Sequence, residues 1–160
     1  MTNELIILFI LFVLNGWAQE TNEKLLFSFS AEKSKPLELK LDTVNNVMIY
    51  RFGKTNEIEL EVKDDLNDTT PTFTYSYYLR GGGIDNLGLD LNYVTFTNKG
   101  FKYIIYSEYL AEEGSTSTGV RVQNVDKGDT YDIEGVANTV KGSLVSPFRW
   151  DELIPTVDME

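Results

Sequence analysis

The stretch FTYSYYLR–GGGIDNLG–LDLNYVTFT–NKG–FKYIIYSEYL, residues 73–110, decides the fold. Its three runs at 73–80, 89–97 and 101–110 are rich in Tyr, Phe and β-branched residues, which is typical of β-strands. A glycine-rich loop separates the first two runs, and NKG suits a short hairpin turn between the last two. We therefore predict three adjacent antiparallel strands.

Strand-like alternation of apolar and polar residues extends on both sides of this block. It recurs at 25–30, 37–42 and 57–63, and shorter runs follow near 120–122, 131–133 and 140–145. We read 111–118 as a flexible polar loop, 150–154 as a helical turn or packed tail, and 157–160 as frayed. We predict an all-β fold: a single antiparallel β-barrel or β-sandwich of about eight to ten strands with a short C-terminal tail.

One strand of the block changes its apolar phase partway along. The apolar side chains of Leu89, Leu91 and Tyr93 share one face of the strand, whereas those of Val94 and Phe96 lie on the opposite face. A β-bulge produces such a change, and so does a strand covered on both faces. Both explanations stay open at this point.

The N-terminus has the pattern of an export signal. Residues 5–14 are ten consecutive apolar residues, fewer than the ~20 that a membrane-spanning helix needs. Gly16 and Ala18 then occupy the −3 and −1 positions of a cleavage site after residue 18, although residues 1–4 contain no Lys or Arg. We expect a signal peptide at 1–18, a single all-β domain at 19–160, and a secreted or periplasmic location. An uncleaved anchor or a buried strand is the alternative.

Composition excludes several functional classes. The chain has no Cys and no His, which removes disulfides, thiolate nucleophiles, Ser-His-Asp triads and the usual zinc sites. Its 14 basic and 25 acidic residues give a net charge of −11, which disfavours nucleic acid and anionic membranes as partners. The same charge favours a cationic partner, although solubility alone also explains it.

The glycine-rich loop is the most unusual local feature. Three glycines allow positive φ angles and free N–H groups that can hold an anion, but they also suit a purely structural hairpin loop. In an up-down-up order this loop and the loop after residue 110 lie at the same end of the sheet. We therefore predict a polar binding rim there, made of Tyr78, Arg80, Gly81, Gly82, Gly83, Asp85, Asn86, Glu112 and Glu113.

An acidic loop at 64–72 raises the question of a metal. Asp64, Asp65, Asn67 and Asp68 offer oxygens of the type that Ca²⁺ prefers, but their spacing fits no EF-hand loop. Asp and Asn are also common turn residues, and we read the segment as a solvated turn. We expect no metal and no cofactor.

Several motifs together resemble an uncharacterised family of small secreted bacterial all-β proteins. The resemblance covers residues 47–148 and rests on YRFG at 50–53, YSYYLRGGG at 75–83 and GLDLNY at 88–93. It implies a secreted all-β fold and no activity. The predicted architecture is also similar to that of small periplasmic β-barrel inhibitors of lysozyme. Those inhibitors carry an exposed Ser/Gly-rich inhibitory loop, and residues 114–117 of this chain are a poor match for it.

Two functional classes follow from these observations. We expect a non-catalytic binding module that captures a protein or glycan outside the cytoplasm, for example a cationic protein such as a hydrolase, in the manner of an inhibitor. The absence of His and Cys favours this class, because those residues supply the commonest catalytic groups. The alternative is a carboxylate-based hydrolase acting on glycans, which requires two carboxyls converging in one cleft.

Overall fold

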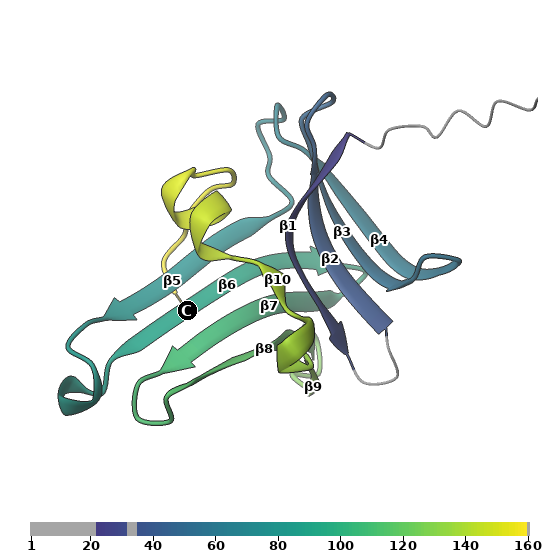
Figure 1. The fold of residues 1–160 in the computed structure, drawn as a ribbon. Coiled ribbons are helices and arrows are strands. Elements are labelled where there is room, and N and C mark those ends of the chain that lie inside the picture. The colour runs from purple at the N-terminus through teal and green to yellow at the C-terminus, as the bar shows by residue number, and fades with distance from the viewer. Residues whose placement is uncertain (1–21, 32–34, 160) are drawn as a thin grey trace, which may run out of the picture.

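The computed structural model describes residues 22–31 and 35–159, and the expected signal peptide lies outside them. The described chain forms two antiparallel five-stranded sheets, arranged as a sandwich and not as a closed barrel (Figure 1). The first sheet has the order β10-β1-β2-β3-β4 and the second β5-β6-β7-β8-β9. Their bounds are β1 Glu23–Ala31, β2 Lys35–Asp42, β3 Val47–Lys54, β4 Glu57–Asp65, β5 Thr74–Arg80, β6 Leu89–Asn98, β7 Phe101–Leu110, β8 Ser115–Asn124, β9 Thr130–Glu134 and β10 Lys141–Gly142.

The central prediction is confirmed, because β5, β6 and β7 pair in sequence order and antiparallel. The NKG segment forms the predicted tight turn: Lys99 and Gly100 have φ angles of 49° and 80°, as a two-residue hairpin with both central residues left-handed requires. Pairing runs without a register shift along the whole of β6. The phase change at Tyr93 and Val94 therefore comes from a strand packed on both faces and not from a bulge.

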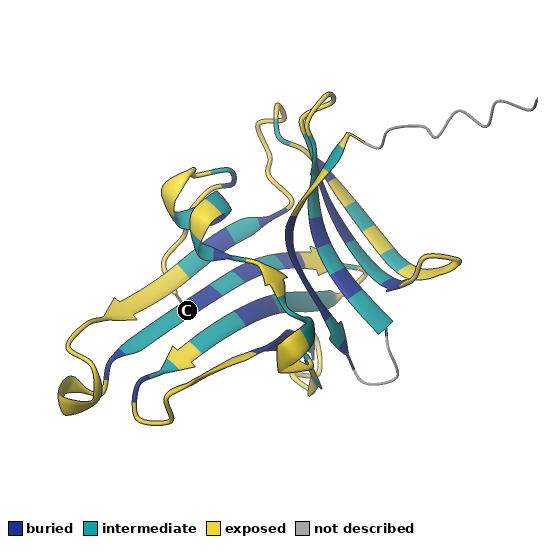
Figure 2. Cartoon of the chain, viewed as in Figure 1, coloured by how far each residue is buried: buried dark blue, intermediate teal, exposed yellow. Residues whose placement is uncertain are grey.

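Aromatic side chains fill the space between the sheets. Figure 2 shows the buried positions gathered where the first sheet crosses the second. Tyr50 of β3 and Phe96 of β6 meet with ring centroids 4.8 Å apart, and Phe73 contacts the same Phe96 ring at 5.1 Å. Leu37 and Leu39 are fully buried on β2, which explains the period-two alternation of that strand.

Two of the predicted strand boundaries need correction. The predicted loop at 111–118 is shorter, because Ser115 already begins β8 and pairs with Leu110. The predicted strand at 140–145 is reduced to the two residues of β10, since Gly142 has a φ of 75° and lies against the backbone of Leu26. The start of β8 was predicted as a loop because its residues are rich in hydroxyl groups. The segment 140–145 was predicted as a strand because it is apolar, but most of it packs without strand pairing.

The C-terminal segment crosses from one sheet to the other (Figure 1). After β10 the chain forms a short helical segment, η4 (Ser146–Trp150), so the helical turn lies slightly earlier than the predicted 150–154. The fully buried Phe148 and the nearly buried Ile154 anchor this segment to the core. Beyond it, the N–H of Val157 donates to the carbonyl of Tyr75, so the tail is still paired at a position predicted to be frayed. Two other short helical segments are η2 (Ile84–Asn86) and η3 (Ala137–Thr139).

Candidate ligand-binding surface

The structure places the two loops of the predicted rim side by side. Leu89 pairs with both Arg80 and Leu110, and the N–H of Ala111 donates to the carbonyl of Gly88 over 2.9 Å. All nine predicted rim residues are exposed: Tyr78, Arg80, Gly81, Gly82, Gly83, Asp85, Asn86, Glu112 and Glu113. The rim thus presents three carboxylates against one guanidinium.

The interior of the glycine-rich loop is occupied by its own contacts. Arg80 donates from Nε and Nη2 to the carbonyl of Leu87, over 2.9 and 2.6 Å. Gly82 and Gly83 have φ angles of 102° and 62°, and a Cβ on Gly82 would overlap the side chain of Asn86. These contacts favour the structural reading of the glycines, because they fold the loop onto itself around the Arg80 side chain.

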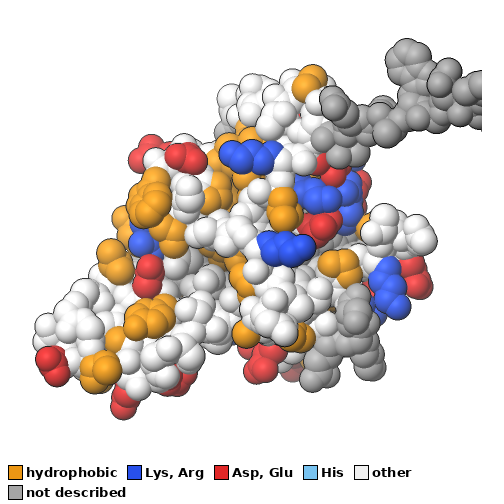
Figure 3. Space-filling view, in the orientation of Figure 1, with side chains coloured by type: hydrophobic (Ala, Val, Ile, Leu, Met, Phe, Trp, Pro, Cys, Tyr) orange, Lys and Arg blue, Asp and Glu red, His pale blue; other side chains and the backbone are white. Residues whose placement is uncertain are grey.

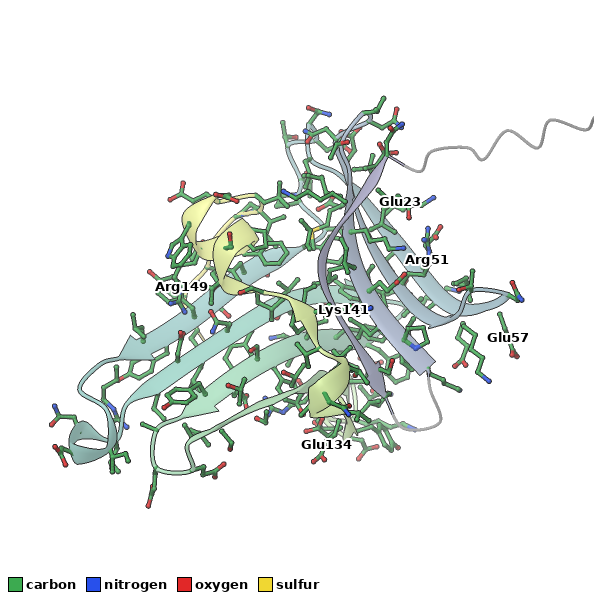
Figure 4. All side chains as sticks on the ribbon, in the orientation of Figure 1. Glu23, Arg51, Glu57, Glu134, Lys141 and Arg149 are labelled. Atoms are coloured by element: carbon green, nitrogen blue, oxygen red, sulfur yellow. The ribbon has the colours of Figure 1, made fainter. Side chains whose placement is uncertain are left out.

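A second cluster, which sequence reasoning missed, lies on the core-facing side of β5 and β6, the two strands that flank the glycine-rich loop. Arg149 of η4 donates from Nη2 to Asp90 over 2.5 Å and to Asn92 over 2.6 Å. The Tyr75 hydroxyl donates to the same Asn92 oxygen over 2.6 Å, and the Arg149 guanidinium lies 4.4 Å from the centre of the Tyr77 ring. Figure 4 shows Arg149 reaching from η4 toward the second sheet.

Burial makes this cluster rigid and electrostatically strong. Asn92 is 2% exposed, and the side chain of Arg149 is 11% exposed. Burial by itself would lower the pKa of Arg149, but hydrogen bonds to Asp90 and Tyr75 raise the pKa on balance. Burial raises the pKa of Tyr75, although the Arg149 charge acts in the opposite direction. The Nε of Arg149 is buried without a hydrogen-bond partner.

Exposed apolar side chains surround this cluster. The register places Leu79, Asp90 and Tyr109 in one row across three strands, and Tyr77 and Asn92 in the row beside it. Here the second sheet extends beyond the cover of the first, and Tyr77, Leu79 and Tyr109 are 42%, 58% and 41% exposed. The space-filling view shows hydrophobic side chains reaching the surface over this part of the sheet (Figure 3). We call these side chains, with those of Asp90, Asn92 and Arg149, the tyrosine shelf.

The opposite face of the second sheet carries a separate charged network. Arg121 donates to both oxygens of Glu108 over 2.7 and 2.9 Å, and the Tyr93 hydroxyl donates to Glu108 over 2.8 Å. Tyr106 donates to Asp132 over 3.0 Å and lies under the Arg121 guanidinium. Burial alone would raise the pKa of Glu108, but hydrogen bonds from Arg121 and Tyr93 lower that pKa on balance. Burial and the hydrogen bond to Glu108 raise the pKa of Tyr93 to about 12.

Two cavities adjoin this network. One of about 490 Å³ is lined by strand residues together with the tail residues Val157, Asp158 and Met159. The other, of about 240 Å³, is lined by Asp132 and Glu134, the only carboxylates that the described residues contribute to its wall. Asp132 is already held by Tyr106, so the two carboxylates are not equivalent.

The acidic loop has the contacts of a turn. Asp64 is 4% exposed, and its carboxylate accepts hydrogen bonds from the N–H groups of Thr72 and Phe73. Asp65 accepts from the N–H and the side-chain amide of Asn67. Over residues 22–31 and 35–159, no group of three or more acidic residues is arranged to hold a metal ion. No helix within that part of the chain is long and apolar enough to cross a membrane.

Comparison with known proteins adds no relative. No family model, no curated protein and no solved structure matches this chain. The resemblance to a family of secreted bacterial proteins therefore stays a prediction, and function has to be argued from the surface itself.

Proposed function

We propose that this protein is a non-catalytic binding module, exported from the cytoplasm, that captures a cationic protein on the tyrosine shelf. The supporting observation is the Arg149 cluster, which fixes Tyr77 beside Asp90 and Asn92 on an open part of the sheet. Tyr and Arg are the residue types most enriched at the energetic centres of protein interfaces. A contact surface built on strands and locked by hydrogen bonds loses little conformational entropy on binding.

The adjacent rim supports a cationic partner. Asp85, Glu112 and Glu113 are exposed at the end of the shelf, while Arg80 is engaged by the carbonyl of Leu87. Together with the net charge of −11, these carboxylates attract a basic partner and raise its rate of association. An apolar centre with an acidic border is the expected layout for this kind of interface.

A glycan hydrolase is the second candidate, and the 240 Å³ cavity is the observation that favours it. Asp132 and Glu134 both line that cavity, as a pair of catalytic carboxyls would. Asp132, however, already accepts a hydrogen bond from Tyr106 and forms an ion pair with Arg121. These contacts give Asp132 a structural role and make it a poor match for a free catalytic carboxyl. The binding module therefore remains our proposal.

The proposal is tested by direct binding. Immobilised protein is exposed to a panel of basic secreted hydrolases, with lysozyme as the first probe, and to a panel of glycans. We expect one or more basic proteins to bind, and Tyr77→Ser with Tyr109→Ser to weaken that binding roughly tenfold or more. Tyr131→Ser is the matched control, because Tyr131 is 63% exposed on β9 and lies outside the shelf.

Three outcomes would refute the proposal. The panel of basic proteins could fail to bind, or it could bind the shelf variant as tightly as the wild type. Release of reducing ends from the glycans, lost in Asp132→Asn or Glu134→Gln, would establish the hydrolase instead.

A further inference from the structure

The outer edge of β5 offers main-chain hydrogen-bonding groups that the described part of the chain leaves open. Among the described strands, β5 is the last of its sheet and has β6 as its one neighbour. The N–H and carbonyl of Tyr75 point away from β6, because they bond to Pro155 and Val157 of the tail. By the period of two, the same groups of Tyr77 and Leu79 point to this edge as well. Over residues 22–31 and 35–159, no segment pairs with Tyr77 or Leu79 on that side.

The other sheet edges are protected in the ways that soluble proteins commonly use. The β4 edge carries exposed charged side chains, namely those of Glu57, Glu59, Glu61 and Lys63. The β9 edge carries Asp132 and Glu134, and β10 has only two residues. Charges and short length discourage pairing with another chain. On β5, by contrast, three consecutive uncharged residues, Tyr77, Tyr78 and Leu79, are 42%, 45% and 58% exposed.

We propose that β5 pairs antiparallel with β5 of a second copy of this chain, around a two-fold axis at Tyr78. In this register Tyr77 of one copy faces Leu79 of the other, and the two pairs exchange about four main-chain hydrogen bonds. The two Tyr78 residues then form a non-hydrogen-bonded pair, whose side chains are in close contact. The result is one continuous sheet of both copies, with a self-complementary interface.

The register fits the surrounding residues. Pairing ends at Ser76 and Arg80, which face each other across the axis, because the main-chain groups of Tyr75 already bond to the tail. No two like charges are opposed within residues 76–80, since Arg80 is the only charged residue among them. The tail itself shows that this edge accepts an extended segment, because Thr156 forms a bridge with Tyr75. Strand addition at such an edge gains main-chain hydrogen bonds and side-chain contacts together.

A single engineered thiol tests this arrangement. The chain has no cysteine, so a disulfide in Tyr78→Cys can form only between two copies. Cα atoms of a non-hydrogen-bonded pair are ~4.5 Å apart, which lies within the range that a disulfide spans. Under mild oxidation of the purified chain we expect Tyr78→Cys to cross-link roughly tenfold faster than Tyr131→Cys, whose thiol is at least as exposed.

A proline on the same strand distinguishes specific strand pairing from nonspecific association of the chains. Leu79→Pro removes an N–H that points to the open edge, without removing a hydrogen bond to β6. We expect it to abolish the cross-link in Tyr78→Cys and to leave a monomer in sedimentation, while Trp150→Ser, which removes a 72% exposed apolar side chain, leaves both unchanged. Circular dichroism confirms that each variant is folded.

The proposal is overturned if the chain stays monomeric up to roughly 1 mM, an effective concentration typical of linked partners. Equal cross-linking of Tyr78→Cys and Tyr131→Cys, or persistence of the dimer in Leu79→Pro, overturns it as well.

Discussion

Replacing Arg149 by methionine should destabilise the protein substantially, although the residue lies in an irregular C-terminal segment. Methionine keeps most of the side-chain volume and removes the charge. The change deletes hydrogen bonds to Asp90 and Asn92 and the contact with the Tyr77 ring. Hydrogen bonds to charged groups contribute about 1.5–3 kcal/mol each, and a cation–π contact about 0.5–2 kcal/mol.

Two effects reduce that sum. The Asp90 side chain is 31% exposed, so water screens its attraction to the guanidinium. The buried Nε of Arg149 has no partner, and its removal recovers about 1–3 kcal/mol of desolvation free energy. We therefore expect a net loss of about 2–4 kcal/mol in the free energy of unfolding. With an m-value of about 2 kcal/mol per molar, the urea midpoint falls by about 1–2 M.

Urea unfolding followed by circular dichroism measures this loss, and Arg80→Met is the matched control. Arg80 is exposed, and among the described residues its side chain bonds to the carbonyl of Leu87 alone, so its replacement should cost less than about 1 kcal/mol. Asp90→Asn alone and combined with Arg149→Met completes a double-mutant cycle, in which we expect a coupling of about 1–2 kcal/mol. If Arg149→Met is no more destabilising than Arg80→Met, the cluster does not hold η4 to the sheet, and our reasoning fails.

Two further predictions concern the opposite face of the second sheet. Gly119→Ala should cost about 1–3 kcal/mol, because its Cβ would meet the Tyr106 ring and the backbone of β9, whereas Gly81→Ala, with open space around its Cβ, should be nearly neutral in the same urea experiment. The lowered pKa of Glu108 means that its contribution to stability is fully present above its unfolded pKa and is lost as pH falls through the folded pKa. Glu108→Gln should therefore be less stable than the wild type at pH 7 and lose less stability on acidification below pH 4.5, and parallel stability–pH curves for the two proteins would contradict this.

The sequence predicted the three strands β5, β6 and β7 of the second sheet, because local signals agree with one another there. The aromatic and β-branched runs favour strands, and NKG supplies the left-handed residues of a hairpin turn, so β6 and β7 follow from neighbouring residues alone. The hydroxyl run at 115–118 favoured a loop by composition. It forms a strand because β7 offers a long partner, with Tyr109 facing Thr116 across the pair. Tertiary pairing overrode local preference at that point.

The Arg149 cluster could not be predicted from spacing. Arg149 lies 57 residues from Asn92 along the chain, and they meet only because η4 crosses back over the second sheet. One signal was present in the sequence: Asn92 shares the phase of Val94 and Phe96, so it puts a polar side chain on the buried face of β6. A buried amide needs a hydrogen-bonding partner, and that requirement indicates a polar cluster without naming its members.

The contacts of Arg80 move the expected centre of binding from the rim to the shelf. A guanidinium that bonds to Leu87 within its own loop gives up part of that geometry if it turns to meet a partner. The exposed Asp85, Glu112 and Glu113 are free to act at a distance, through their charge. Charges at the border of an interface mainly change the rate of association and its salt dependence, whereas aromatic side chains at the centre control dissociation. In the proposed complex, neutralising the rim should therefore slow capture, and truncating Tyr77 or Tyr109 should shorten the lifetime of the bound state.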